Sequence, residues 1–196
     1  MERLSALAVA LAVGALATPA LAHTGAGPAH DLTHGFLHPL SGLDHILAMV
    51  AVGLYAAQLG GRSLWLLPAA FVGTMMAGGV AGYAGVGLPM VEQGIALSVI
   101  AMGVLIAAGL RLPALAATAL VAMFALAHGH AHGSEGAELA AFLPYAAGFV
   151  AATALLHGAG IAAGLALDRL GALPAMVLKR AAGVAGALAG IALLAG

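Results

Sequence analysis

Long apolar segments separated by short polar loops dominate the chain from residue 38 onward. Six such segments cover residues 39–59, 64–83, 89–110, 113–131, 139–165 and 174–195. Each is close to the roughly 20 residues that a helix needs to cross the hydrocarbon core of a bilayer. Proline opens four of them, which suits the first turn of a helix. The pattern predicts an all-α, polytopic membrane protein, a compact bundle of six transmembrane helices that forms one domain over residues 23–196.

The first apolar stretch of the chain is of a different kind. Arg3 provides a positive start, residues 4–17 are apolar, and Ala20-Leu21-Ala22 is the small-x-small pattern that a signal peptidase cleaves. We therefore expect residues 1–22 to be a cleaved signal peptide, with His23 as the mature N-terminus outside the cytoplasm. The alternative is an uncleaved transmembrane helix, for which the stretch is short.

Glycine recurs in the predicted spans at positions where two helices could pack closely. Gly78, Gly82, Gly183, Gly186 and Gly190 lie within apolar segments. Small residues at helix interfaces in membranes allow the backbones to approach each other. The predicted bundle should therefore be compact.

Composition excludes several classes of protein. The chain is 63% hydrophobic and only 7% charged, whereas a soluble domain carries roughly 25% charged residues. Its net charge of −1 argues against a nucleic-acid partner, because little positive charge is available to neutralise phosphates. The absence of cysteine excludes disulfides, thiolate ligands and iron–sulfur clusters. Nine histidines nevertheless outnumber the six lysines and arginines together.

The positive charges predict the orientation. With the mature N-terminus outside, the loops that hold Arg62, Arg111 and Arg169 are cytoplasmic, and Lys179 and Arg180 begin the last span on that side. The outer loops contain no lysine or arginine, as the positive-inside rule requires. We expect a multi-pass protein of the bacterial inner membrane with both mature termini in the periplasm.

This topology places most of the polar chemistry on the periplasmic side. Eight of the nine histidines lie there, and only His157 lies deep in a span. The histidines and the neighbouring acids on that side are His23, His30, Asp31, His34, His38, Asp44, His45, Glu92, His128, His130, His132, Glu135 and Glu138. Ionisable residues are costly in a membrane and commonly mark an ion pathway.

Spacing suggests which of these residues act together. His38 and His45 are seven residues apart, or two helical turns, so a continuous helix would place them on one face beside Asp44. In the fourth span His128 and His132 are four residues apart. If that helix continues, Glu135 lies on the same stripe, three residues further on. Imidazole and carboxylate without thiolate suit nickel, cobalt, zinc or copper(II).

Simpler explanations stay open for individual residues. A histidine at a helix end is often an interfacial polar residue, and Glu135 can lie in a solvated loop. Glu92 can be a first-turn acid that complements the helix dipole. His23 can merely gather metal near the membrane. For His157 we expect a packing hydrogen bond between helices, with an exit-side ligand as the alternative.

Two motifs resemble a known family. The segment 38–45 reads H-P-L-S-G-L-D-H and is similar to the H-P-x-x-G-x-D-H signature of the HupE/UreJ family. The segment 128–135 reads H-G-H-A-H-G-S-E and resembles that family's H-G-x-A-H-G-x-E signature, although Ala127 stands where the family usually has an aromatic residue. The resemblance covers essentially the whole mature chain and implies a nickel, sometimes cobalt, permease associated with hydrogenase or urease. The residues that it implies as motif carriers are His38, Asp44, His45, His132 and Glu135.

Together these features favour a secondary or channel-like permease rather than an enzyme. There is no nucleotide-binding motif, and the membrane potential can drive a divalent cation inward by roughly 4.6 kcal/mol per 100 mV. No resident cofactor is required; the partners are the transported Ni²⁺ or Co²⁺ ion, the lipid bilayer and a possible second copy of the chain. The alternatives are a cobalt or zinc permease and a membrane haem protein whose histidines are axial ligands.

Overall fold

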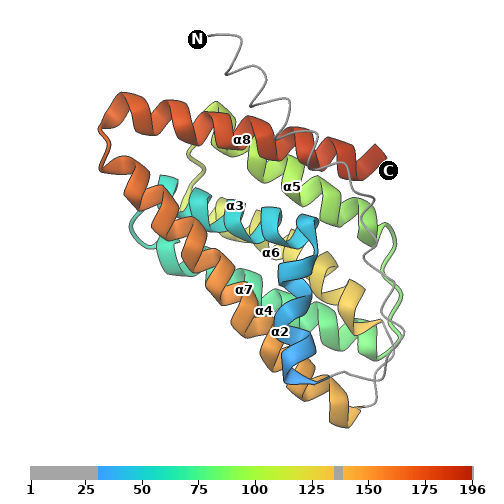
Figure 1. The fold of residues 1–196 in the computed structure, drawn as a ribbon. Helices are drawn as coiled ribbons and strands as arrows, with labels where there is room; N and C mark the ends of the chain where they lie inside the picture. Colours follow the sequence, from blue (N-terminus) through green and yellow to red (C-terminus); the bar gives the residue numbers. More distant parts are fainter. Residues whose placement is uncertain (1–30, 135–138, 196) are drawn as a thin grey trace.

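The computed structural model describes residues 31–134 and 139–195, and these residues form helices joined by short loops (Figure 1). The helices are α2 (Leu32–Ser41), α3 (Leu43–Leu59), α4 (Ser63–Tyr83), α5 (Val91–Ala108), α6 (Ala114–Gly133), α7 (Leu139–Asp168) and α8 (Ala172–Ala195). By length and composition, α4 to α8 can each cross a membrane, and the number of candidate spans is six if the bent pair α2–α3 is counted as one broken span. The all-α, polytopic prediction is confirmed. The predicted signal peptide lies outside the described residues.

The first predicted span is not one helix. The prediction of a continuous segment over residues 39–59 is wrong, because α2 and α3 meet at an angle of 82°. Gly42 lies between them with an extended backbone at φ −91° and ψ 119°, which cannot continue a helix. A Cβ on Gly42 would lie 2.8 Å from a carboxylate oxygen of Asp44 and 3.0 Å from His45 Nδ1. Glycine therefore lets the chain bend directly over these two side chains.

Helix α3 is the centre of the bundle and contacts every other described helix. On one side α5 pairs with α8, and on the other α4 pairs with α6, while α2 and α7 cover the remaining face (Figure 1). The predicted close approach is confirmed at Gly78 and Gly82, where an added Cβ would collide with the α6 backbone, and at Gly183, where it would collide with α5. Gly129 and Gly133 of α6 meet α4 in the same way. These contacts explain the compactness of the bundle.

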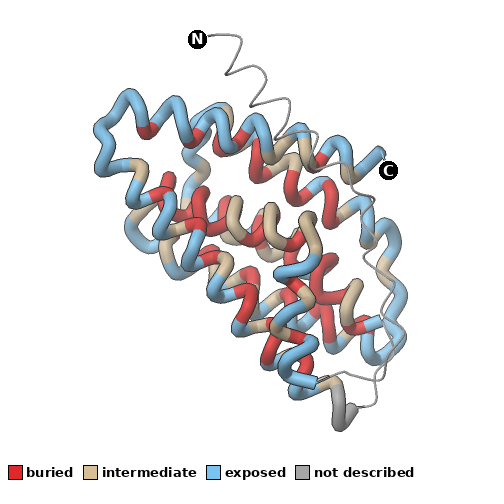
Figure 2. The backbone as a smooth tube through the Cα atoms, in the orientation of Figure 1, coloured by how far each residue is buried: buried red, intermediate tan, exposed pale blue. Residues whose placement is uncertain are grey.

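The outer faces of the bundle are apolar and exposed, whereas the buried residues gather between the helices (Figure 2). Leu115 and Leu173, for example, are 82% and 68% exposed. Exposed apolar surface of this extent is unfavourable in water, but it is the surface that lipid tails cover. Burial thus agrees with the composition in indicating a multi-pass membrane protein.

The two ends of the bundle differ chemically. At one end Arg111 donates a hydrogen bond to the backbone oxygen of Gln58 at 2.7 Å, and Lys179 pairs with Asp168 at 2.6 Å. The opposite end carries the beginning of α3 and the end of α6, where most of the described histidines lie. The antiparallel helices therefore separate cationic loops from histidines, as the charge pattern predicted.

Candidate metal site

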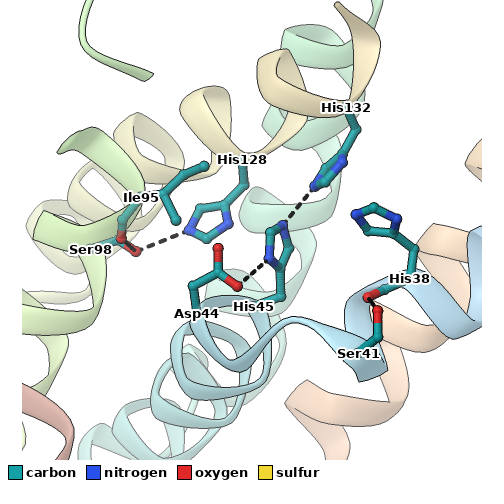
Figure 3. Close-up of polar contacts among 8 residues, drawn as sticks. All are labelled: His38, Ser41, Asp44, His45, Ile95, Ser98, His128 and His132. Atoms are coloured by element: carbon teal, nitrogen blue, oxygen red, sulfur yellow. Dashed lines mark hydrogen bonds and ion pairs between the residues drawn. The ribbon is translucent and has the colours of Figure 1, made fainter. Parts of the chain in front are cut away.

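Four histidines from three helices converge in one place (Figure 3), and this place is the end of the bundle opposite the cationic loops. His38 comes from α2, His45 from α3, and His128 and His132 from α6. The centroid of the His132 ring lies 4.6 Å from that of His38 and 4.7 Å from that of His45. The ring centroids of His128 and His45 lie 5.2 Å apart. We call these four residues the histidine cluster. The structure thus joins the two segments that the sequence singled out.

His38 reaches the cluster by a different route from the one its spacing suggested. The bend at Gly42 interrupts the helix between His38 and His45, so the two residues do not share a face of one continuous helix. Their rings nevertheless lie 6.1 Å apart, because α2 folds back against α7. Gly35 of α2 and Gly148 of α7 allow this approach, since a Cβ on either would collide with the other helix's backbone.

The closest polar contact in the cluster joins His45 and His132, whose Nε2 atoms lie 2.6 Å apart (Figure 3). Two neutral imidazole lone pairs cannot face each other at this distance without repulsion, so one nitrogen must carry a proton or both must bind a cation. Two nitrogens at right angles on a cation, each at about 2.1 Å, would lie about 3.0 Å apart. The distance between the two Nε2 atoms would therefore have to increase by only about 0.4 Å for both to bind one metal ion.

Asp44 supports His45 from the side away from His132. Its Oδ1 atom lies 2.9 Å from His45 Nδ1, within ion-pair distance, although the orientation is not that of a good hydrogen bond. The His45 side chain is 6% exposed and the Asp44 side chain 20%. A carboxylate beside one imidazole nitrogen, with the other nitrogen facing a cation, is a common outer-shell arrangement in metal sites. Asp44 also adds a negative charge where a cation would sit.

His128 is fully buried, and its orientation is set by Ser98, a residue that the sequence reasoning missed. The Ser98 hydroxyl donates to the backbone oxygen of Ile95 at 2.6 Å, and His128 Nε2 lies 3.0 Å from the hydroxyl oxygen of Ser98 (Figure 3). Because the hydroxyl hydrogen is already used, His128 must donate through Nε2, which leaves its Nδ1 lone pair available. No hydrogen-bond partner for that nitrogen exists among the described residues. In the sequence, the sign of this role was a single hydroxyl residue, Ser98, within an apolar span.

Aromatic side chains of α7 form one wall of the cluster. The ring of Phe149 lies 4.6 Å from that of His132 and 6.0 Å from that of His45, and Tyr145 lies 6.0 Å from His38. These aromatic residues are four apart and so share a helix face, a pattern that the sequence reasoning also missed. A pocket of about 110 Å³ between α4, α6 and α7 reaches His132 beside this wall.

Not all of the predicted site residues belong to this cluster. Glu92 is exposed in the first turn of α5, and the contacts that join the cluster do not include it. His130 instead lies with Nε2 2.6 Å from the backbone oxygen of Val86, which ties α6 to the loop after α4. His23 and Glu135 lie outside the described residues. Within residues 31–134 and 139–195, no group of three or more histidine or acidic side chains is arranged so that it could hold a metal ion, so metal binding stays a prediction.

His157 also differs from what its sequence suggested. It is 1% exposed, and neither ring nitrogen has a hydrogen-bond partner in the part of the chain that the structure describes. The predicted packing hydrogen bond is therefore wrong. Its ring instead meets Phe71 edge to face, with the centroids 4.9 Å apart.

Comparison with known proteins places almost the whole chain in one family. A family model described as "HupE / UreJ protein" matches residues 10–193. The protein named "Protein HupE" from Rhizobium leguminosarum bv. viciae is 50% identical to this chain over 185 residues, which cover 94% of this chain and 95% of the relative. No solved structure matches significantly.

Proposed function

The chain belongs to the HupE/UreJ family, and on that premise we propose that it is a permease for uptake of a divalent transition metal, with nickel as the preferred ion. The protein would act as a secondary or channel-like permease in the bacterial inner membrane. The delivered metal would supply an enzyme such as hydrogenase or urease. Cobalt is the closest competing ion, because the same donors bind both metals.

The observation that carries this proposal is the pair of facing nitrogens on His45 and His132. The two residues come from different helices, and their Nε2 atoms are held 2.6 Å apart at the end of an apolar bundle. Imidazole nitrogens are good ligands for nickel and cobalt, and no thiolate is present to favour a softer ion. The spacing also favours a bare cation over haem, because the centroids of the two rings, 4.7 Å apart, leave no room for a porphyrin between them.

The cluster can lower the cost of taking a cation from water into the membrane. A divalent ion must lose part of its hydration shell, and fixed nitrogen donors can replace the lost waters one by one. Asp44 offsets part of the ion's charge at the same place. Donors on α2, α3 and α6 act from different directions, so a small shift of one helix changes how many of them reach the ion.

The direction of transport follows from the two chemically different ends. Arg62, Arg111 and Arg169 lie in loops opposite the histidine cluster, and the positive-inside rule assigns such loops to the cytoplasm. The cluster would then open to the periplasm, with both mature termini on that side. A negative interior would attract the ion, because moving one positive charge inward releases roughly 2.3 kcal/mol of free energy per 100 mV of membrane potential.

Uptake of radiolabelled nickel by cells with and without this chain tests the proposal. We expect chain-dependent uptake at limiting nickel that a tenfold excess of cobalt reduces more strongly than zinc does. His130→Gln is a matched control, because this histidine is next to the cluster but faces the Val86 carbonyl. Equal uptake in both strains at limiting nickel would refute the proposed function.

A further inference from the structure

A second buried imidazole lies deeper in the bundle than the histidine cluster. His157 on α7 is 1% exposed, and the structure places no hydrogen-bond partner beside either of its nitrogens among the described residues. Buried polar groups in native proteins nearly always have a partner, so an exception calls for a specific reason. Packing alone is a poor reason, because an apolar ring would fill the same space without two polar atoms.

Phe71 connects this imidazole to the histidine cluster. Its ring lies 5.5 Å from that of His128 and 4.9 Å from that of His157, so it packs against both imidazoles. Phe71 itself is 1% exposed. Phe71 is therefore a neighbour that His157 shares with the most deeply buried histidine of the cluster.

The position of His157 along α7 also relates it to the cluster. Phe149 contacts the cluster, Thr153 follows one turn later and His157 one turn after that, so the three residues share a face. At 1.5 Å per residue, His157 lies about 12 Å further along α7 than Phe149. Asp168 ends the helix at the cationic end of the bundle. His157 thus lies between the cluster and the opposite surface.

Two further polar atoms lie at Thr153, one helical turn before His157 and on the side of the cluster. The buried Thr153 hydroxyl donates to the sulfur of Met75 at 3.8 Å. Thr153 is four residues before His157, so the two side chains are neighbours on the helix surface. An oxygen and a thioether sulfur can supplement an imidazole nitrogen around a borderline cation.

We propose that His157 is an inner binding site for the transported divalent metal, reached from His128 past the ring of Phe71. The inference rests on the proposed function, because it assigns a second step to the same pathway. Conduction requires sites that bind strongly enough to admit an ion and weakly enough to release it. A site with a single imidazole meets the second condition better than the cluster does, so an ion that reaches His157 is released onward more readily than one held at the cluster.

The test uses the full chain with Ni²⁺ as the probe, in detergent for binding and in proteoliposomes for transport. His157→Phe keeps an aromatic ring against Phe71 but removes both nitrogens. We expect it to bind one Ni²⁺ ion fewer per chain at saturation and to lower the maximal uptake rate at least tenfold. The half-saturating nickel concentration should change less than twofold, since the cluster captures the ion. His130→Gln should match the wild type in all three measurements.

The remaining outcomes separate the two proposals. If His157→Phe binds and transports nickel like the wild type, the inner site is wrong and the proposed function stands. A lower rate with unchanged nickel stoichiometry would also overturn the inner site, because it would show a packing role. If the wild type transports no nickel but His157→Phe still loses one bound ion, the inner site stands and the proposed function fails. His157→Leu carries the same test if the phenylalanine variant does not insert.

Discussion

The Nε2 atoms of His45 and His132 lie 2.6 Å apart although 87 positions separate the two residues in the chain. His45 belongs to the first turn of α3 and His132 to the last turn of α6. The antiparallel packing of the bundle brings these two turns to the same end. The pair therefore links the two sequence motifs in one place, and it is the part of the molecule that substitutions can test most directly.

Removing either member of this pair should nearly abolish nickel uptake. In His45→Ala or His132→Ala the remaining imidazole loses the nitrogen that faces it, and a cation leaving water loses one fixed donor. We expect the initial rate at limiting nickel to fall at least about tenfold, and the double variant to be little worse than either single variant, because the donors act as a unit. The measurement is initial-rate uptake normalised to inserted protein. Normal uptake by both single variants would show that the pair is structural.

Asp44→Asn tests the carboxylate beside His45. The amide keeps the size of the side chain but removes the negative charge 2.9 Å from His45 Nδ1. Loss of such an outer-shell partner typically costs about 10- to 100-fold in metal affinity or activity, so nickel uptake should fall within that range. Asp168→Asn is the control, because Asp168 pairs with Lys179 at the other end of the bundle. Equal effects of the two variants would argue against a special role for Asp44.

Ser98→Ala should raise the half-saturating nickel concentration several-fold without preventing insertion. The variant leaves His128 Nε2 without its 3.0 Å partner, so the ring no longer has a fixed tautomer and orientation. Thr118→Ala is a suitable control, since the Thr118 hydroxyl donates to the oxygen of Ala114 in its own helix and to no other helix in the described part of the chain. The two variants are compared in nickel-dependent uptake over a range of concentrations. An unchanged value in Ser98→Ala would mean that His128 takes no part in binding.

Gly133→Ala should destabilise the bundle. The added methyl group would collide with the backbone of Gly79 on α4, and backbone cannot move aside as a side chain can. Overpacking of this kind costs about 1–3 kcal/mol and sometimes more, so the melting temperature in detergent should fall. Gly73→Ala on α4 has open space around its Cβ and should melt like the wild type. Similar melting of both variants would contradict the close packing of α4 and α6.

Reporter fusions test the orientation. Fusions after Tyr83 and Gly196 should report the periplasm, and fusions after Arg62 and Arg169 the cytoplasm, because the positively charged loops stay inside. A C-terminus that reports the cytoplasm would refute the six-span topology. It would also place the histidine cluster on the wrong side for uptake.

Part of the site was predictable from sequence because it depends on local spacing. His128 and His132 are four residues apart in one helix, and they do lie together beside His45. The prediction that His38 and His45 lie close together is correct, but the reason given for it is not. It assumed a continuous helix, whereas Gly42 bends the chain by 82°. A bend of this kind depends on what the side chains on either side must contact, which spacing does not show.

The sequence alone determined the number of apolar segments and the separation of histidines from cationic loops. Those features depend on the length of a segment relative to the bilayer and on charges within single loops, which are local properties. Only the tertiary structure decided that Ser98 orients His128, that Phe149 packs against the cluster and that Phe71 contacts both His128 and His157. Each of these contacts joins two different helices, and its geometry depends on how closely glycine-rich surfaces let those helices pack.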